Sequence, residues 1–285
     1  MPVKRLSADY EKGLVDASMS ALLELSVTLR KHKDSIVLVG GWAPYFLIQE
    51  FGREGFEHVG SIDIDLAVNP DNIDNDAYAG IIELIEDRGY EQRLSKDKQA
   101  VPSSYIKSLR SGSRAYDIQV DFLTSKDMSE KGHRHRRIQR DLRARTNEEC
   151  VLAFEHNIKK RISGTLPGNG ESDAEILMLD ITGCLGMKGM ALGDRYKEKD
   201  AYDIFAVIAH CLESPSAVAK IIKPFMKEPL MQKSMESIRT KFRSINAEGP
   251  SWVANFIQPT DPMAKQRLSA EAYVKVSEFL DALRS

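Results

Sequence analysis

The segment "GSIDIDLAV" at residues 60–68 constrains this chain most, because two aspartates interrupt an otherwise apolar run. Its alternating, β-branched pattern predicts a strand, and side chains two residues apart on a strand point to the same side. Asp63 and Asp65 are therefore neighbours on one face, with the isoleucines and the leucine on the other. Two carboxylates this close repel each other unless a cation separates them, and oxygen ligands suit Mg²⁺. The segment predicts a metal-binding strand; the alternative is a solvated edge of a half-exposed strand.

A third carboxylate would complete a site for two Mg²⁺ ions. The segment "AYDIQVDFLT" at residues 115–124 alternates in the same way and predicts another strand. Asp117 and Asp121 share a face of it, but four residues of strand span roughly 13 Å, so both cannot ligate one cluster. Asp121 has the more apolar neighbours, and we predict that it joins Asp63 and Asp65 as a metal ligand.

A glycine pair precedes the aspartate strand. "SIVLVGG" at residues 35–41 predicts a buried strand stopped by Gly40 and Gly41, and "WAPYFLIQEF" predicts a helix with Pro44 in its first turn. Glycines at such a turn let backbone N–H groups approach a phosphate closely. The combination of strand, glycine pair, helix, aspartate pair and third aspartate is much more specific than any of its parts.

The remaining periodicity defines the fold class, which is α/β (α+β). It predicts a mixed sheet with helices, followed by a mostly helical C-terminal domain, and places the domains at 1–180 and 181–285. The other predicted elements are helices at 8–31 and 76–90 and strands at 155–164 and 173–180.

Composition narrows the function classes. The net charge of −2 means that any nucleic-acid-binding surface is local rather than global. The three cysteines are odd in number and show no C-x-x-C spacing, which argues against a disulfide framework or a zinc site. We expect no signal peptide, no membrane partner and a cytoplasmic location.

The motifs "GGWAPYFL", "GSIDIDL" and "VDFL" together resemble the nucleotidyltransferase superfamily of the DNA polymerase beta type. The stretch "KGMALGDRYKEKDAYDI" at residues 188–204 is similar to the signature of AbiEii-type toxins, and the resemblance covers roughly 35–210. It implies transfer of NMP from an NTP to an acceptor hydroxyl on RNA, such as a tRNA 3′ end. It also implies a toxic arrest of translation and a cognate antitoxin. Two departures are Lys199, where arginine is more usual, and the long interval from Gly41 to Asp63.

The C-terminal signature is predicted to contribute to the active site. If residues 188–203 form one helix, Arg195 and Lys199 lie about 20° to either side of Lys188, and the three make a basic stripe. Asp203, four residues after Lys199, would hold that lysine. Three glycines on the nearly opposite face predict close helix packing or a break at "LGDR". The predicted catalytic residues are Asp63, Asp65, Asp121 and Lys188, and the predicted nucleotide-binding residues are Gly40, Gly41, Ser61, Lys188, Arg195, Lys199 and Asp203.

Residues 126–146 contain eight Lys or Arg and three Asp or Glu, in a chain that is slightly acidic overall. This segment directly follows the Asp121 strand, so we predict that Arg134, Arg136 and Arg137 bind RNA phosphates. The alternatives are a solvated connector or a surface for an acidic partner protein.

Two other functions remain open. One is nucleotidyl transfer to a small aminoglycoside-like molecule, which needs the same catalytic residues. The other is a non-catalytic regulator that binds nucleotide or RNA. The basic segment favours RNA over a polycationic small molecule, and the three aspartates argue against a regulator.

Overall fold

The apolar segments around Gly40 and Asp65 form two neighbouring antiparallel strands. β1 (Ile36–Val39) is buried along its whole length, as its β-branched composition predicts. β2 (Asp63–Val68) starts at an exposed residue and ends buried, so its apolar side chains anchor the strand while the aspartates stay near solvent. The structure, a computed structural model, describes residues 6–73, 80–126, 135–138 and 142–285.

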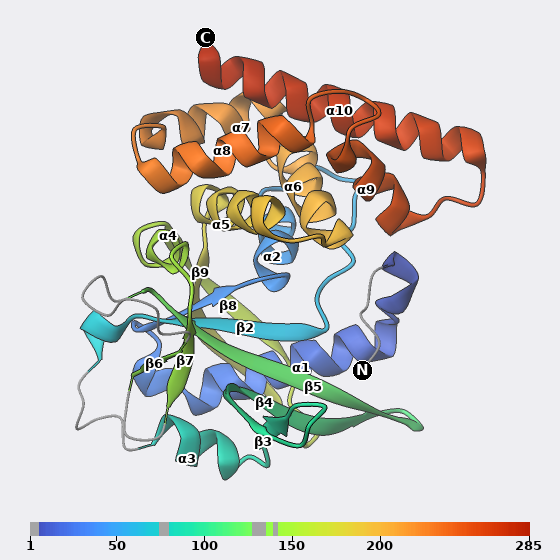
Figure 1. Ribbon diagram of the computed structural model, residues 1–285. Helices are drawn as coiled ribbons and strands as arrows, with labels where there is room; N and C mark the ends of the chain where they lie inside the picture. Colours follow the sequence, from blue (N-terminus) through green and yellow to red (C-terminus); the bar gives the residue numbers. More distant parts are fainter. Residues whose placement is uncertain (1–5, 74–79, 127–134, 139–141) are drawn as a thin grey trace. The chain divides into compact units, whose positions relative to one another are not determined.

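These strands belong to a mixed sheet, which confirms the predicted fold class. Its order is β3-β4-β5-β2-β1-β9-β8, with β7 pairing β5 and β6 pairing β7. β2 runs parallel to β5, and β1 runs parallel to β9 (Figure 1). The other strands are β3 (Glu91–Leu94), β4 (Ala100–Ser111), β5 (Arg114–Thr124), β6 (His135–Arg137), β7 (Arg143–Thr146), β8 (Asn157–Thr165) and β9 (Glu171–Leu179).

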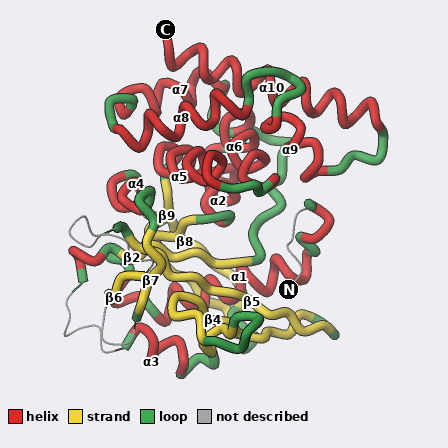
Figure 2. The backbone as a smooth tube through the Cα atoms, viewed as in Figure 1, coloured by secondary structure: helices red, strands yellow, loops and turns green. Residues whose placement is uncertain are grey.

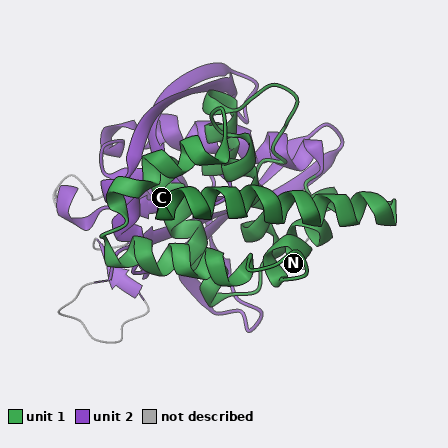
Figure 3. Cartoon of the chain, turned by 90° about the horizontal axis from the view of Figure 1, so that it is seen from above, with its two compact units in different colours: residues 1–10, 43–60, 180–285 green, residues 11–42, 61–179 purple. Residues whose placement is uncertain are grey.

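Contacts divide the chain into two units that are not contiguous in sequence (Figure 3). Unit 1 comprises Met1–Tyr10, Ala43–Gly60 and Asp180–Ser285. Unit 2 comprises Glu11–Trp42 and Ser61–Leu179 and contains the whole sheet. The predicted domains at 1–180 and 181–285, with the second contributing to the active site, stay a prediction.

The described residues of unit 2 form three α-helices, and the longest covers one face of its sheet. The half-buried Lys107–Glu24 ion pair, at 2.6 Å, joins β4 to this helix. Lys107 lies opposite Ile118 in the strand register, on the face away from Asp121. The helices are α1 (Lys12–Thr28), α3 (Ile81–Glu86) and α4 (Cys150–Glu155).

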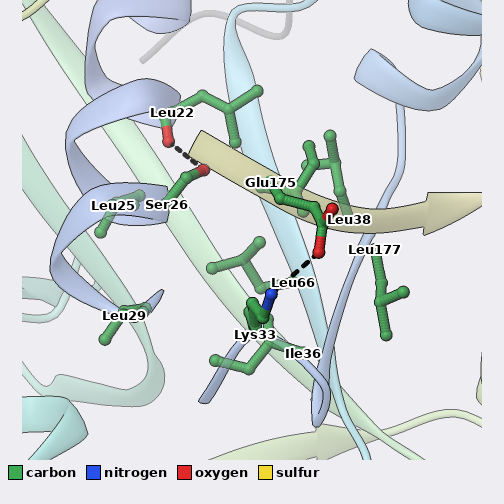
Figure 4. A pocket seen from close by; sticks show the side chains of 11 residues that line it. Leu22, Leu25, Ser26, Leu29, Lys33, Ile36, Leu38, Leu66, Glu175 and Leu177 are labelled. Atoms are coloured by element: carbon green, nitrogen blue, oxygen red, sulfur yellow. Dashed lines mark hydrogen bonds and ion pairs between the residues drawn. The ribbon is translucent and has the colours of Figure 1, made fainter. Parts of the chain in front are cut away.

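A small apolar cavity of about 30 Å³ lies between α1 and this face of the sheet (Figure 4). Leu22 and Leu25 of α1 line it together with Leu38 and Leu66, and the Lys33–Glu175 ion pair lies at its edge. Leu66 points away from the aspartates, because it is one residue from Asp65 on the same strand. The cavity is too small for a nucleotide and lies on the wrong face to serve the carboxylates.

Unit 1 is built from helices, as predicted for the C-terminal part of the chain (Figure 2). Several begin at side-chain caps that satisfy free backbone N–H groups: Asp180 accepts from Gly183, and Ser214 accepts from Ala217. None of the helices among the described residues has both the length and the apolar character of a membrane span. The helices are α2 (Trp42–Phe51), α5 (Ile181–Asp194), α6 (Glu198–His210), α7 (Pro215–Ile222), α8 (Pro229–Lys241), α9 (Glu248–Ile257) and α10 (Pro262–Arg284).

Three elements differ from the sequence expectations or were missed by them. Residues 188–203 do not form one helix, and the alternative, a break at "LGDR", is confirmed: α5 ends at Asp194 and Arg195 is extended. The hairpin partner β4 was not predicted at all, since its mixed polar pattern hides the strand. Of the helix predicted at 76–90, the described part is helical only over α3, and Gly89 has a φ of +81°.

The predicted glycine packing is confirmed where α5 meets α8. A Cβ at Gly189 would lie 2.0 Å from the Ser234 hydroxyl oxygen and 2.8 Å from the Ser234 carbonyl oxygen. A Cβ at Gly193, one turn later, would meet Ser237 side-chain atoms alone. The two helix backbones therefore approach most closely at Gly189.

We expect Gly189→Ala to lower the free energy of unfolding by about 1–3 kcal/mol, the usual cost of overpacking, although alanine is the better helix former by about 1 kcal/mol. Gly193→Ala is the matched control and should be close to neutral, because the Ser237 hydroxyl can rotate away. Urea denaturation of both variants measures this. Equal stability of the two variants would contradict the prediction and would show that α8 can move away at Ser234 without cost.

Candidate active site

The three predicted metal ligands come together on one face of the sheet. Asp65 lies directly opposite Asp121 in the parallel β2–β5 register, and Asp63 lies opposite Gln119. Neighbouring strands are about 4.8 Å apart, and residues directly opposite in a ladder share a face. Asp117 is placed elsewhere, next to Ser108 of β4, whose hydroxyl donates a hydrogen bond to it. The strand register thus pairs Asp65 with Asp121 rather than with Asp117.

Asp121 sits in surroundings that disfavour its negative charge. Burial, followed by the charge of Asp65, raises the pKa of Asp121. Gln119 Nε2 donates a hydrogen bond of 2.9 Å to Asp121 Oδ2, which fixes the carboxylate and partly offsets these effects. A cation placed between Asp65 and Asp121 would remove the repulsion. The all-oxygen donor set of these carboxylates fits Mg²⁺.

Gly40 makes room for Asp65. It follows β1 with a φ of +71°, which favours glycine, and a Cβ there would lie 2.1 Å from Asp65 Oδ2. Ser61, also predicted to bind nucleotide, is buried and donates a hydrogen bond of 3.0 Å to the Asp63 carbonyl oxygen. Both residues therefore shape the start of the aspartate strand.

We expect Gly40→Ala to displace the Asp65 carboxylate and to weaken metal-dependent activity by at least about tenfold, because small misplacements of catalytic groups are costly. Gly112→Ala is the control, since Gly112 also has a positive φ, +62°, but open space around its Cβ position. Steady-state kinetics against Mg²⁺ concentration measures the effect. A similar loss in both variants would assign it to backbone strain alone.

In unit 1, the predicted basic residues converge on two buried aspartates of α6. Lys188 Nζ lies 3.1 Å from Asp200 Oδ1 and 2.6 Å from Asp203 Oδ2. Lys199 Nζ lies 2.8 Å from Asp203 Oδ1, which is the contact predicted from their spacing. Arg195 binds Asp200 through Nε at 2.9 Å and Nη2 at 3.2 Å. We call Lys188, Arg195, Lys199, Asp200 and Asp203 the charge cluster.

Burial and mutual attraction both shift the pKa values in the charge cluster. Burial opposes ionisation of Asp203, but Lys188 and Lys199 outweigh it and hold the pKa well below its usual 3.8. The pKa of Lys188 is raised, because Asp203 and Asp200 outweigh its burial. Lys199 has a single carboxylate partner, so burial and the charge of Lys188 lower its pKa to about 8. The aspartates are therefore charged at neutral pH.

His58 completes the surroundings of Asp203. Its Nε2 lies 2.9 Å from Asp203 Oδ1, and its Nδ1 accepts a hydrogen bond of 3.1 Å from the Gly60 N–H. Burial lowers its pKa to about 4, so the ring is neutral and Nε2 carries the proton donated to Asp203. Arg53, five residues earlier, instead donates to the Ala209 carbonyl oxygen. His58 therefore belongs to the surroundings of Asp203, whereas Arg53 binds the end of α6.

Exposure separates the members of the predicted basic stripe. The Lys188 and Lys199 side chains are 8% and 4% exposed, whereas Arg195 is 48% exposed. Arg195 is the member of the stripe that reaches solvent. The two lysines are buried and form ion pairs with the aspartates of α6.

The basic segment after β5 contributes two short strands where the structure describes it. Arg136 and Arg137 lie on β6, which pairs with β7, and β7 extends the sheet beside β5. Arg137 lies opposite Arg143, while Arg136 points to the other side. Most of the described residues of this segment therefore belong to the sheet. Arg134 lies outside the described residues.

Several site residues were missed from the sequence. Gln119 could have been found, because it lies two residues before Asp121 on an alternating strand. Ser104 lies on β4, and the signal for this strand is the serine-glycine turn at Gly112, which joins it to β5. Arg93 lies on β3, which pairs with β4. Asp200, which binds both Lys188 and Arg195, was missed because the sequence leaves open the helix break that places Arg195 beside it.

A mixed sheet that carries three adjacent carboxylates is the arrangement that the resemblance to nucleotidyltransferases predicted. The family model of the nucleotidyl transferase AbiEii toxin, of type IV toxin–antitoxin systems, matches residues 25–252. The chain therefore belongs to this family.

Two solved structures are similar to this chain. One is an antigenic nucleotidyltransferase-like protein from Paracoccidioides brasiliensis, with 13% identity, a TM-score of 0.42, and coverage of 84% of this chain and 94% of that one. The other is MenT4, a nucleotidyltransferase toxin from Mycobacterium tuberculosis H37Rv, with 14% identity, a TM-score of 0.38, and coverage of 95% and 89%. No curated protein sequence matches this chain.

Proposed function

We propose that this toxin transfers NMP from an NTP to an acceptor hydroxyl on RNA, such as a tRNA 3′ end, in a reaction that needs two Mg²⁺ ions. The observation that carries the proposal is the direct pairing of Asp65 with Asp121, with Asp63 on the same face. We also propose a cognate antitoxin, which membership of a toxin–antitoxin family supports, and a cytoplasmic location.

The three carboxylates have distinct roles in this mechanism. Asp63 and Asp65 would hold both ions, and Asp121 would complete the site on the acceptor side. The bound ions would neutralise phosphate charge and favour loss of the hydroxyl proton. The acceptor oxygen attacks the α-phosphorus in line, the bond from that phosphorus to the bridging oxygen breaks, and pyrophosphate leaves with the electron pair.

Binding of the triphosphate is assigned to the nucleotide-binding residues that the sequence predicts. Gly40, Gly41 and Ser61 border the aspartate strand, and glycine N–H groups are suited to phosphates. Of the motif residues, Arg195 has the exposure that a phosphate contact needs. Lys188, Lys199 and Asp203 would support it through the charge cluster. Arg136 and Arg137, with Arg134, are proposed to contact the acceptor RNA.

A small-molecule acceptor is the second candidate. Aminoglycoside-like molecules are polycationic and would favour an acidic surface next to Asp121. The described strands beside Asp121 carry arginines instead, which favours an acceptor with phosphates. A regulator without catalysis would have no use for carboxylates held in mutual repulsion.

The test is to incubate the purified protein with Mg²⁺, each labelled NTP in turn and total RNA, and to resolve the products on a gel. We expect one NTP to label an RNA band, and expression of the wild type to slow bacterial growth. Label that appears on small molecules and on no RNA would favour the second candidate. Growth inhibition that persists in Asp63→Asn would place toxicity outside this site.

A further inference from the structure

Beside Asp121, the neighbour of β5 in the sheet changes from β4 to β7. β4 pairs with β5 up to Ser104, opposite Asp121, and β7 pairs with it from Arg145, opposite Leu123. A cavity of about 200 Å³ opens where one strand leaves and the other enters. Its polar lining consists of Arg93, Ser103, Ser104, Asp121, His135 and Arg145.

The register places most of these groups on the carboxylate face. Ser104 lies opposite Asp121, and Leu123, two residues beyond Asp121, lies opposite Arg145. His135 in turn lies opposite Arg145. Arg93 reaches the same place from β3, because its Nε donates a hydrogen bond of 2.8 Å to the Ser104 hydroxyl oxygen. The metal-binding face therefore continues into a basic cavity.

The cavity carries two arginines and one carboxylate, and Arg145 interacts electrostatically with Asp121. Among the residues that the structure describes, no carboxylate forms an ion pair with Arg93 or Arg145. Guanidinium groups are donors that recognise phosphate oxygens, and arginine can bind them in pairs. Asp121 at one wall repels an anion, but the two arginines of the lining carry the larger, opposite charge.

We propose that this cavity binds the last phosphodiester of the acceptor strand, with Arg93 and Arg145 as its positioning residues. The proposal rests on the proposed function, since it deepens the description of the acceptor. In a nucleic acid, that phosphate is one ribose away from the terminal hydroxyl. Its capture beside Asp121 would orient the attacking oxygen and reduce the entropy cost of the reaction. A small hydroxyl acceptor without a phosphate would gain nothing from the cavity.

A binding measurement without metal tests this independently of catalysis. The probes are two single-stranded RNAs with a 5′ fluorophore, identical except that the last linkage of one is a neutral methylphosphonate. In EDTA, the full-length wild type should bind the charged RNA at least about tenfold more tightly, as expected for hydrogen bonds to a charged group. Arg145→Ala and Arg93→Ala should bind both RNAs with equal, weaker affinity. Arg110→Ala removes an exposed arginine from β4 and should keep the preference.

Three results would overturn the inference: no preference in the wild type, no RNA binding, or a preference that survives both arginine variants. Melting curves establish that each variant is folded, and Arg145 is exposed enough to be replaced without loss of core contacts.

Transfer assays with the same two RNAs separate this inference from the proposed function. If the wild type labels both RNAs equally, the function stands and the phosphate subsite is wrong. If no NTP labels any RNA, the proposed function fails, while the binding preference still decides whether the cavity recognises the terminal phosphate.

Discussion

In Asp65→Asn, NMP transfer should fall by at least about a thousandfold, because a metal ligand is lost that supports several kcal/mol of charge stabilisation in the transition state. The metal-free fold should survive and melt no lower than the wild type. The reason is that Asp65 raises the pKa of Asp121 across the β2–β5 register, and this repulsion disappears in the variant. Calorimetric titration with Mg²⁺, melting curves and labelled-NTP assays measure the three effects.

Asp117→Asn is the matched control for this prediction. Asp117 lies on the same strand and face as Asp121, but beside Ser108 and away from Asp65. Its replacement should leave Mg²⁺ binding and transfer close to wild type. Near wild-type transfer by Asp65→Asn, or a comparable loss in Asp117→Asn, would contradict the carboxylate site described above.

In Asp203→Ala, the free energy of unfolding should fall by roughly 3–5 kcal/mol, the cost of removing one partner from a buried ion pair. Lys188 and Lys199 would remain buried with one carboxylate fewer, and the proton that His58 donates would lose its acceptor. Urea denaturation followed by circular dichroism measures the loss.

Asp173→Ala provides the comparison, because the Arg161–Asp173 pair is exposed and should contribute little. The difference between wild type and Asp203→Ala should also depend on pH. The pKa of Asp203 is lowered by folding, so its stabilisation is fully present above its ordinary value of 3.8 and is lost as the pH falls below it. A difference that grows towards acid pH would show that Asp203 is not stabilised as a carboxylate.

Some of these features follow from sequence periodicity alone. A period of two places Asp63 and Asp65 on one face of a strand wherever that strand lies, because side chains alternate. The same rule excludes Asp117 and Asp121 from one cluster by distance. The positive φ of Gly40 and the close packing of Gly189 were likewise predictable from the turn and the helix in which these glycines stand.

Other features depend on which segments become neighbours, and no local pattern specifies this. The β2–β5 register decides that Asp121 lies beside Asp65. The helix break at Arg195 turns a predicted basic stripe into a charge cluster around Asp200 and Asp203, because buried lysines require carboxylate partners. The exchange of β4 for β7 creates the arginine-lined cavity from strands whose polar sequences hide them. Periodicity thus determined which side chains share a face, whereas tertiary pairing decided which charges meet, since those contacts join residues far apart in the chain.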